Sequence, residues 1–125
     1  FSASMPPYAV ATVRECLRVL KSEPDRRERL WRNADRLKAG LQSLGFDTGR
    51  SVTPIIPIIV GDNVRTFFFW KVLFEMGIFT NPVIAPAVPE NSARIRTSLM
   101  ATHTEALIDE ALEIFRRAGR QVGLI

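Results

Sequence analysis

The segment ARIRTSLMATHT, residues 93–104, indicates the fold and raises the first question about function. Its residues alternate between an apolar set and a more polar set, namely Ala93, Ile95, Thr97 and Leu99, and then Arg94, Arg96 and Ser98. Such alternation predicts a β-strand with one buried face. The two arginines then share the other face. There they either form a solvated edge or hold an anion in a cleft, because a guanidinium fork matches a carboxylate two-on-two.

Helical patterns lie on both sides of this strand. Apolar residues recur at helical spacing over 5–24, 25–44 and 102–125, and these segments are predicted to be amphipathic helices. A fourth segment, 62–77, is apolar on almost every side, which predicts a helix that is buried on most sides. We interpret its aromatic run as core or subunit contact. The run is too short for a membrane span, which needs about 20 apolar residues.

Several residues have the chemistry of helix caps. Gly45 and Gly77 follow predicted helices and are expected carboxyl caps. Asp62 or Asn63 is expected to cap the third helix. Thr102, with a glutamate three residues later, has the spacing of a capping box for the last helix.

Short extended segments complete the pattern, and we expect strands at 46–49, 54–61 and 78–83 in addition to 93–99. A proline inside the second of these predicts an edge position or a bulge. The resulting order is helix, helix, strand, strand, helix, strand, strand, helix. It predicts an α+β domain, an α/β sandwich in which helices cover one face of a small mixed sheet of three to four strands.

Composition narrows the class of protein. The chain has 125 residues and 46% apolar residues, which is enough for one domain, 1–125, with one core. Its net charge is +4, but its basic runs at 26–32 and 116–120 contain or adjoin acidic residues, so we expect solvated helix faces and no nucleic-acid partner. The single cysteine, Cys16, forms no internal disulfide, and it fits a reducing, cytoplasmic compartment.

The search for catalytic groups finds little in this chain. There is no nucleophile motif, phosphate-binding loop or set of metal ligands, so we expect no catalytic residue and no metal site here. The single histidine, His103, lies beside a predicted helix start, where a structural role is favoured over general-base chemistry. Arg96 is the candidate for ligand binding.

Three motifs, in this order, resemble one family. FSASMPP (1–7), GIFTNPVIAPAVP (77–89) and ARIRTSLMATHT (93–104) are similar to segments of the α-oxoamine synthases, which are pyridoxal phosphate (PLP) enzymes of fold type I. The resemblance implies the carboxyl-terminal small domain of such an enzyme, with 1–22 as a connecting segment and helix from the large domain. It also implies a homodimeric acyltransferase that condenses an amino acid with an acyl-CoA, with loss of CO2 and with PLP as its cofactor.

The resemblance also assigns roles to individual residues. Arg96 matches the family arginine that binds the substrate carboxylate, and Ser2 with Ala3 matches a segment that reaches the PLP phosphate of the neighbouring subunit. The Schiff-base lysine and the other residues that hold the cofactor belong to the large domain. Arg94 is expected to be a surface or rim charge.

This chain departs from the family pattern at two positions. Ile84 stands where some members have an arginine, and Asn91 stands where the usual residue is glycine. The segment 81–89 favours a serine palmitoyltransferase-like member. 2-Amino-3-ketobutyrate CoA ligase and 8-amino-7-oxononanoate synthase remain alternatives. A non-catalytic interaction domain or a basic nucleic-acid-binding module is the alternative of another class.

Overall fold

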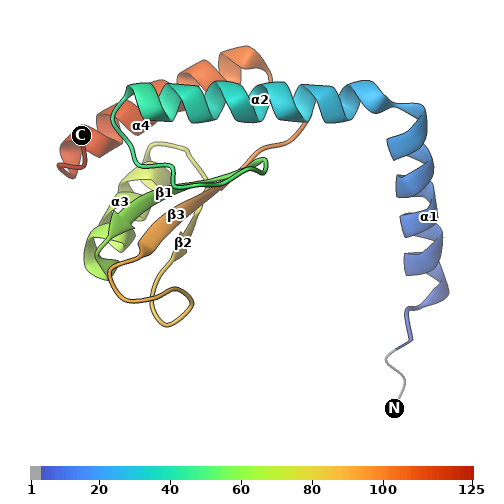
Figure 1. Cartoon of the computed structure of the whole chain (residues 1–125), viewed down its shortest axis with the longest axis horizontal. Helices are drawn as coiled ribbons and strands as arrows, with labels where there is room; N and C mark the ends of the chain where they lie inside the picture. Colours follow the sequence, from blue (N-terminus) through green and yellow to red (C-terminus); the bar gives the residue numbers. More distant parts are fainter. Residues whose placement is uncertain (1–3) are drawn as a thin grey trace.

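The computed structural model describes residues 4–125, and its elements follow one another in the predicted α+β manner (Figure 1). They are α1 (Pro7–Ser22), α2 (Pro24–Ser43), β1 (Ile55–Gly61), α3 (Asn63–Glu75), β2 (Asn81–Val83), β3 (Ala93–Ser98) and α4 (Glu105–Gln121). Figure 1 shows α2 and α4 running side by side above the sheet in this view, while α1 projects away from the start of α2.

The sheet has three strands in the order β1-β3-β2. Both strand pairs are antiparallel, so the expected mixture of strand directions is not observed. Ile95 in the central strand lies opposite Ile58 of β1 and Pro82 of β2. The prediction for 54–61 is confirmed in both respects, because β1 lies at an edge and its register shifts between Ile59 and Gly61.

Two predicted strands differ from the structure. Residues 46–49 form no strand, because the Asp47 side chain accepts a hydrogen bond from Gly49 N at 2.8 Å and Gly49 turns the chain with a φ of 58°. Asp47 O also accepts one bond from Ile59 N of β1 at 2.8 Å, but the local turn prevents a continuous ladder. The strand predicted over 78–83 is reduced to β2, because Ile78 N bonds back to Leu73 O at 2.9 Å and so belongs to the end of α3.

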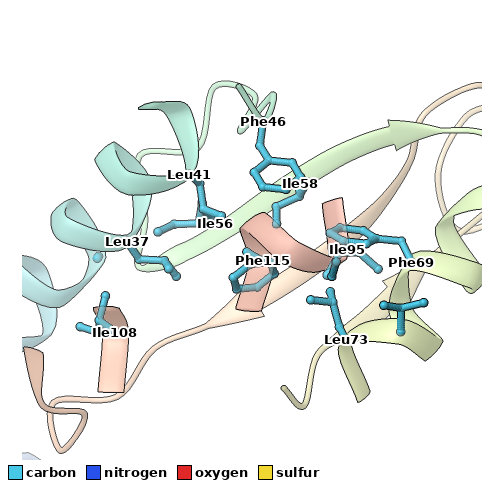
Figure 2. Packing of buried hydrophobic residues seen from close by; sticks show 13 residues of the cluster. Leu37, Leu41, Phe46, Ile56, Ile58, Phe69, Leu73, Ile95, Ile108 and Phe115 are labelled. Carbon is cyan, nitrogen blue, oxygen red and sulfur yellow. The ribbon is translucent and has the colours of Figure 1, made fainter. Parts of the chain in front are cut away.

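The core lies on one face of the sheet, between it and helices α2, α3 and α4 (Figure 2). Figure 2 shows its main side chains, which include Leu41 from α2, Ile58 from β1, Phe69 from α3, Ile95 from β3 and Phe115 from α4. Phe46 joins them, with its ring centroid 5.9 Å from that of Phe69 and 6.4 Å from that of Phe115. The prediction that helices cover one face of the sheet is confirmed.

Three helices end at a glycine with a positive φ, as the sequence predicts for Gly45 and Gly77. At α3, Gly77 N bonds to Phe74 O and Ile78 N to Leu73 O, which together form a Schellman motif. The start of α4 differs from the prediction. Thr104 is its amino cap, and its hydroxyl accepts from Leu107 N at 3.2 Å, so the capping box at Thr102 does not form. Asp62 caps α3, as one of the two expected residues.

Helix α3 is less buried than predicted. Its buried residues are Thr66, Phe69, Val72 and Leu73, while Phe67, Phe68 and Phe74 are between 46% and 54% exposed. The difference arises because only one side of α3 contacts the sheet. Helix α1 has no buried residue, and its apolar stripe lies open. None of the described helices has the length and apolar character that a membrane crossing requires.

Candidate functional site

The candidate site lies on the face of the sheet opposite the core, which we call the open face. In β3, Ala93, Ile95 and Thr97 are buried, whereas Arg96 and Ser98 are exposed and Arg94 is half-buried. The alternation of a strand therefore separates the core residues from the polar ones, as the sequence predicts. Arg94 and Arg96 both lie on the open face.

Arg96 lies in the middle of this face, because β3 is the central strand. Its cross-strand neighbours are Pro57 in β1 and Asn81 in β2. The guanidinium Nη2 donates a hydrogen bond to the Asn81 side-chain oxygen at 3.3 Å. Among residues 4–125 no ion pair involves Arg96. Its positive charge and its remaining donors are therefore available to an anionic ligand.

Arg94 has a different environment, although it lies on the same face. Its Nε donates to Ser92 O at 2.9 Å, two residues away, and the side chain is half-buried. This bond holds the arginine against the loop that precedes β3. The contact fits the expected role as a rim charge.

The loop over 84–92 connects β2 to β3 and borders the open face. Ala85 N donates to the Asn63 side chain at 3.3 Å, which ties the loop to the start of α3. The peptide bond between Ala85 and Pro86 is cis. Asn91 has a φ of 58°, a left-handed conformation that asparagine tolerates better than most residues. Asparagine at the usual glycine position thus preserves the turn.

The corner after β3 is held by hydrogen bonds to the backbone. His103 Nδ1 accepts from Met100 N at 3.3 Å, and the buried Asn33 side chain donates to Met100 O at 3.0 Å and to His103 O at 2.8 Å. These bonds fix the direction in which the chain leaves the strand. They support the structural role predicted for His103.

A cavity of about 320 Å³ lies on the core side of β3. Its lining includes Ile78, Thr97, Leu99, Ile108 and Phe115, and it is largely apolar. Arg96 does not contribute to it, since that side chain is on the opposite face of the strand. We assign the candidate site to the open face because the available charge is there.

The two other predicted site residues, Ser2 and Ala3, lie outside the described residues 4–125. Within that range no cluster of three or more metal-binding side chains occurs. Cys16 is a free thiol exposed on α1. The sequence pattern does not reveal Asn81, because its contact with Arg96 depends on the register of a three-residue strand.

Comparisons with known proteins agree with this fold. Over its whole length the chain is 42% identical to an 8-amino-7-oxononanoate synthase of Thermoanaerobacter pseudethanolicus, of which it covers 32%. It is 46% identical over 121 residues to a serine palmitoyltransferase of Sphingobacterium spiritivorum, covering 97% of this chain and 30% of the relative. The chain thus spans about a third of the length of these relatives.

A solved structure gives the same result. The serine palmitoyltransferase of S. paucimobilis with a bound PLP–myriocin aldimine superposes with a TM-score of 0.93 at 37% identity, over 100% of this chain and 32% of that one. These relatives confirm the resemblance to α-oxoamine synthases. The model of the family "Aminotransferase class I and II" matches residues 1–115. The chain therefore belongs to the aminotransferase class I and II family.

Proposed function

We propose that this chain is the carboxyl-terminal small domain of a PLP-dependent α-oxoamine synthase, which condenses an amino acid with an acyl-CoA and releases CO2 and CoA. The observation that carries the proposal is Arg96, held on the open face of a rigid sheet with no acidic partner among residues 4–125. Residues 1–22 are proposed to be the segment that connects this domain to a large domain. The lone helix α1, which has no buried residue, supports that division.

The residues of this chain fit a domain that receives a substrate and leaves the covalent attachment of the cofactor to a lysine elsewhere. Its only lysines are Lys21, Lys38 and Lys71, and all three lie on helices. Lys38 donates to Ser51 O at 2.8 Å, and Lys71 is 3.8 Å from Glu75. None is on the open face, in agreement with a Schiff-base lysine outside this chain. When bound, PLP supplies an electron sink for the carbanion at the α-carbon of the amino acid.

Arg96 is proposed to bind the carboxylate of the amino acid. The guanidinium offers parallel N–H donors that match the two oxygens of a carboxylate, and its position on β3 restricts the directions from which the ligand approaches. Fixing the carboxylate sets the orientation of the α-carbon and of the bond to be broken. This contribution is positioning and charge neutralisation, without proton transfer.

The amino acid and acyl-CoA are proposed to be those of a serine palmitoyltransferase-like enzyme, which acts in sphingolipid biosynthesis. The identities of 46% and 42% to the two kinds of relative are close, so 8-amino-7-oxononanoate synthase is the alternative substrate pair. A panel of serine, glycine and alanine against short-chain and long-chain acyl-CoAs, with CoA release as the readout, distinguishes them. Turnover of serine with a long-chain acyl-CoA is the expected result. Turnover of alanine alone would contradict it.

The assembly is proposed to be a homodimer with shared sites in the cytoplasm. Ser2 and Ala3, at the amino-terminal end of the chain, are the residues proposed to approach the PLP phosphate of the partner subunit. A single free cysteine supports a reducing compartment. Light scattering on the full-length protein is expected to give twice the mass of one chain. A monomer that releases CoA at full rate would contradict shared sites.

The decisive experiment is Arg96→Ala in the full-length protein. Loss of a charge-assisted contact is expected to remove about 1.5–3 kcal/mol of binding to the carboxylate, which raises the KM for the amino acid by about 10- to 150-fold. PLP absorbance should be unchanged. Arg94→Ala is the matched control and should leave KM within about two-fold of wild type, because Arg94 bonds to Ser92 O. An unchanged KM in Arg96→Ala would reject the assigned role.

A further inference from the structure

We infer that Asn81 is a positioning residue, which directs the Arg96 guanidinium toward the substrate carboxylate without neutralising its charge. The inference rests on the proposed function, since it assigns Arg96 a carboxylate ligand. It adds a second side chain to the site and explains why the neighbour of Arg96 is an amide. The argument depends on strand register, on the charge of the partner and on the rigidity of β2.

The register brings Asn81 and Arg96 together across fifteen residues of sequence. Asn81 of β2 is the cross-strand partner of Arg96, and Pro57 is the partner on the other side. Directly opposed residues of an antiparallel pair present their side chains on the same face. The proline side chain has no hydrogen-bonding group, so the polar neighbour of the guanidinium in this row is Asn81. Its side-chain oxygen accepts from Arg96 Nη2 at 3.3 Å.

The chemistry of the partner decides what the contact does. An amide oxygen accepts a hydrogen bond and is neutral, so it restricts the rotation of the guanidinium while the full positive charge stays available. A carboxylate at the same position would form an ion pair with Arg96. An incoming substrate carboxylate would then have to displace that internal partner. Asparagine is therefore suited to orienting an arginine that must bind an anion.

The backbone around Asn81 is held in place on both sides. Thr80 is 4% exposed, and its carbonyl oxygen accepts from Trp70 Nε1 at 3.1 Å, which ties the start of β2 to α3. Pro82 follows Asn81 directly, and its ring fixes the backbone φ. Asn81 thus projects from a constrained segment, and its side chain transmits that constraint to Arg96.

The test compares Asn81→Ala and Asn81→Asp in full-length protein with saturating acyl-CoA and L-serine as the varied substrate, or with the amino acid that the panel selects. Asn81→Ala is expected to raise the KM for the amino acid about 2- to 10-fold, as for one lost hydrogen bond, with kcat nearly unchanged. Asn81→Asp keeps the shape of the side chain and is expected to raise KM by about ten-fold or more, because the new ion pair competes with the substrate.

Calorimetric binding of the same amino acid gives a readout independent of turnover and should show the same order of Kd values. The effect of Asn81→Asp should shrink at high ionic strength, where an exposed ion pair is screened, whereas the effect of Asn81→Ala should not. Val83→Ala is the matched control, since Val83 lies two residues further on the same face of β2. If Val83→Ala raises KM as much as Asn81→Ala, damage to the edge strand explains both and the inference is rejected.

A double variant separates this inference from the proposed function. In the Arg96→Ala background, Asn81→Ala should have no further effect on KM, because Asn81 acts through Arg96. If Arg96→Ala raises KM and both Asn81 variants leave it unchanged, the inference fails and the proposed function stands. If Arg96→Ala itself has no effect, the proposed function fails. Should Asn81→Ala not fold, Asn81→Asp has nearly the same volume and carries the test alone.

Discussion

The two faces of β3 share one backbone but differ in the burial and the polarity of their side chains. Ile95 and Ala93 on the core face are fully buried, while Arg96 and Ser98 on the open face are exposed. One face contacts side chains from three helices, whereas on the other face the cross-strand neighbours of Arg96 are Pro57 and Asn81. In this six-residue strand, alternate positions serve packing of the core and the candidate binding site.

The two faces differ in how their side chains interact with water. Apolar side chains on the core face gain free energy by leaving water, and the gain depends on close packing. A guanidinium on the open face keeps its hydration until a ligand replaces it, so it adds little to folding and much to binding. Variants on the two faces should therefore separate stability from ligand affinity.

The largest expected effect belongs to Ile95→Ala. Removing a buried side chain at 0% exposure should lower the free energy of unfolding by about 2–5 kcal/mol, through lost transfer energy and a residual cavity. Chemical denaturation measures the change. Arg96→Ala, one residue along, should stay within about 0.5 kcal/mol of wild type. Equal losses from the two variants would contradict the division between the faces.

The next effect tests how tightly the core face is covered. A Cβ added at Gly119 of α4 would lie 2.5 Å from Cζ of the buried Phe46 ring, which has little freedom to move. Gly119→Ala is expected to destabilise the protein by about 1–3 kcal/mol through overpacking. The matched variant is Gly40→Ala in α2, where the added Cβ meets the flexible end of Leu112. Thermal unfolding should rank Gly119→Ala as the more damaging change.

The smallest effect belongs to the outer surface of the helices, where Arg36 of α2 contacts Asp109 of α4 at 2.7 Å. Hydrogen bonds from Arg36 lower the pKa of Asp109 below its ordinary value. The stabilisation from this pair is therefore present above about pH 4 and is lost as the pH falls through the depressed pKa. Asp109→Asn should be slightly less stable than wild type at pH 7, and the two unfolding curves should converge in acid. A constant difference at every pH would contradict the linkage.

Much of the fold is predictable from local patterns. Alternation identifies β3, a β-branched run identifies β1, helical periodicity identifies the amphipathic helices, and glycine marks the carboxyl ends at Gly45 and Gly77. The errors occur where short-range hydrogen bonds compete with the pattern. Asp47 forms a turn inside an apparent strand, and Thr104 replaces Thr102 as the cap of α4. In both places the structure depends on which polar side chain bonds to the backbone, and the spacing of residues in the sequence does not determine this.

The candidate site is predictable only in part. The face of Arg96 follows from the alternation of β3, and the structure agrees. The contact with Asn81 depends on which residue of β2 lies opposite Arg96, and a strand of three residues has too short a pattern to fix its register. For the aromatic run of α3 the sequence leaves core and subunit contact open, because an apolar helix does not reveal how many of its sides are covered within one chain.

The prolines of the sheet have a consequence for self-association. Ile59 N donates outward to Asp47 O at 2.8 Å, so by alternation the nitrogen of Pro57 also faces the outer edge of β1. The same alternation turns the nitrogen of Pro82 outward on β2. Each border of the sheet therefore lacks an N–H where a foreign strand would need one. Proline at these two positions disfavours growth of the sheet into intermolecular β-aggregates.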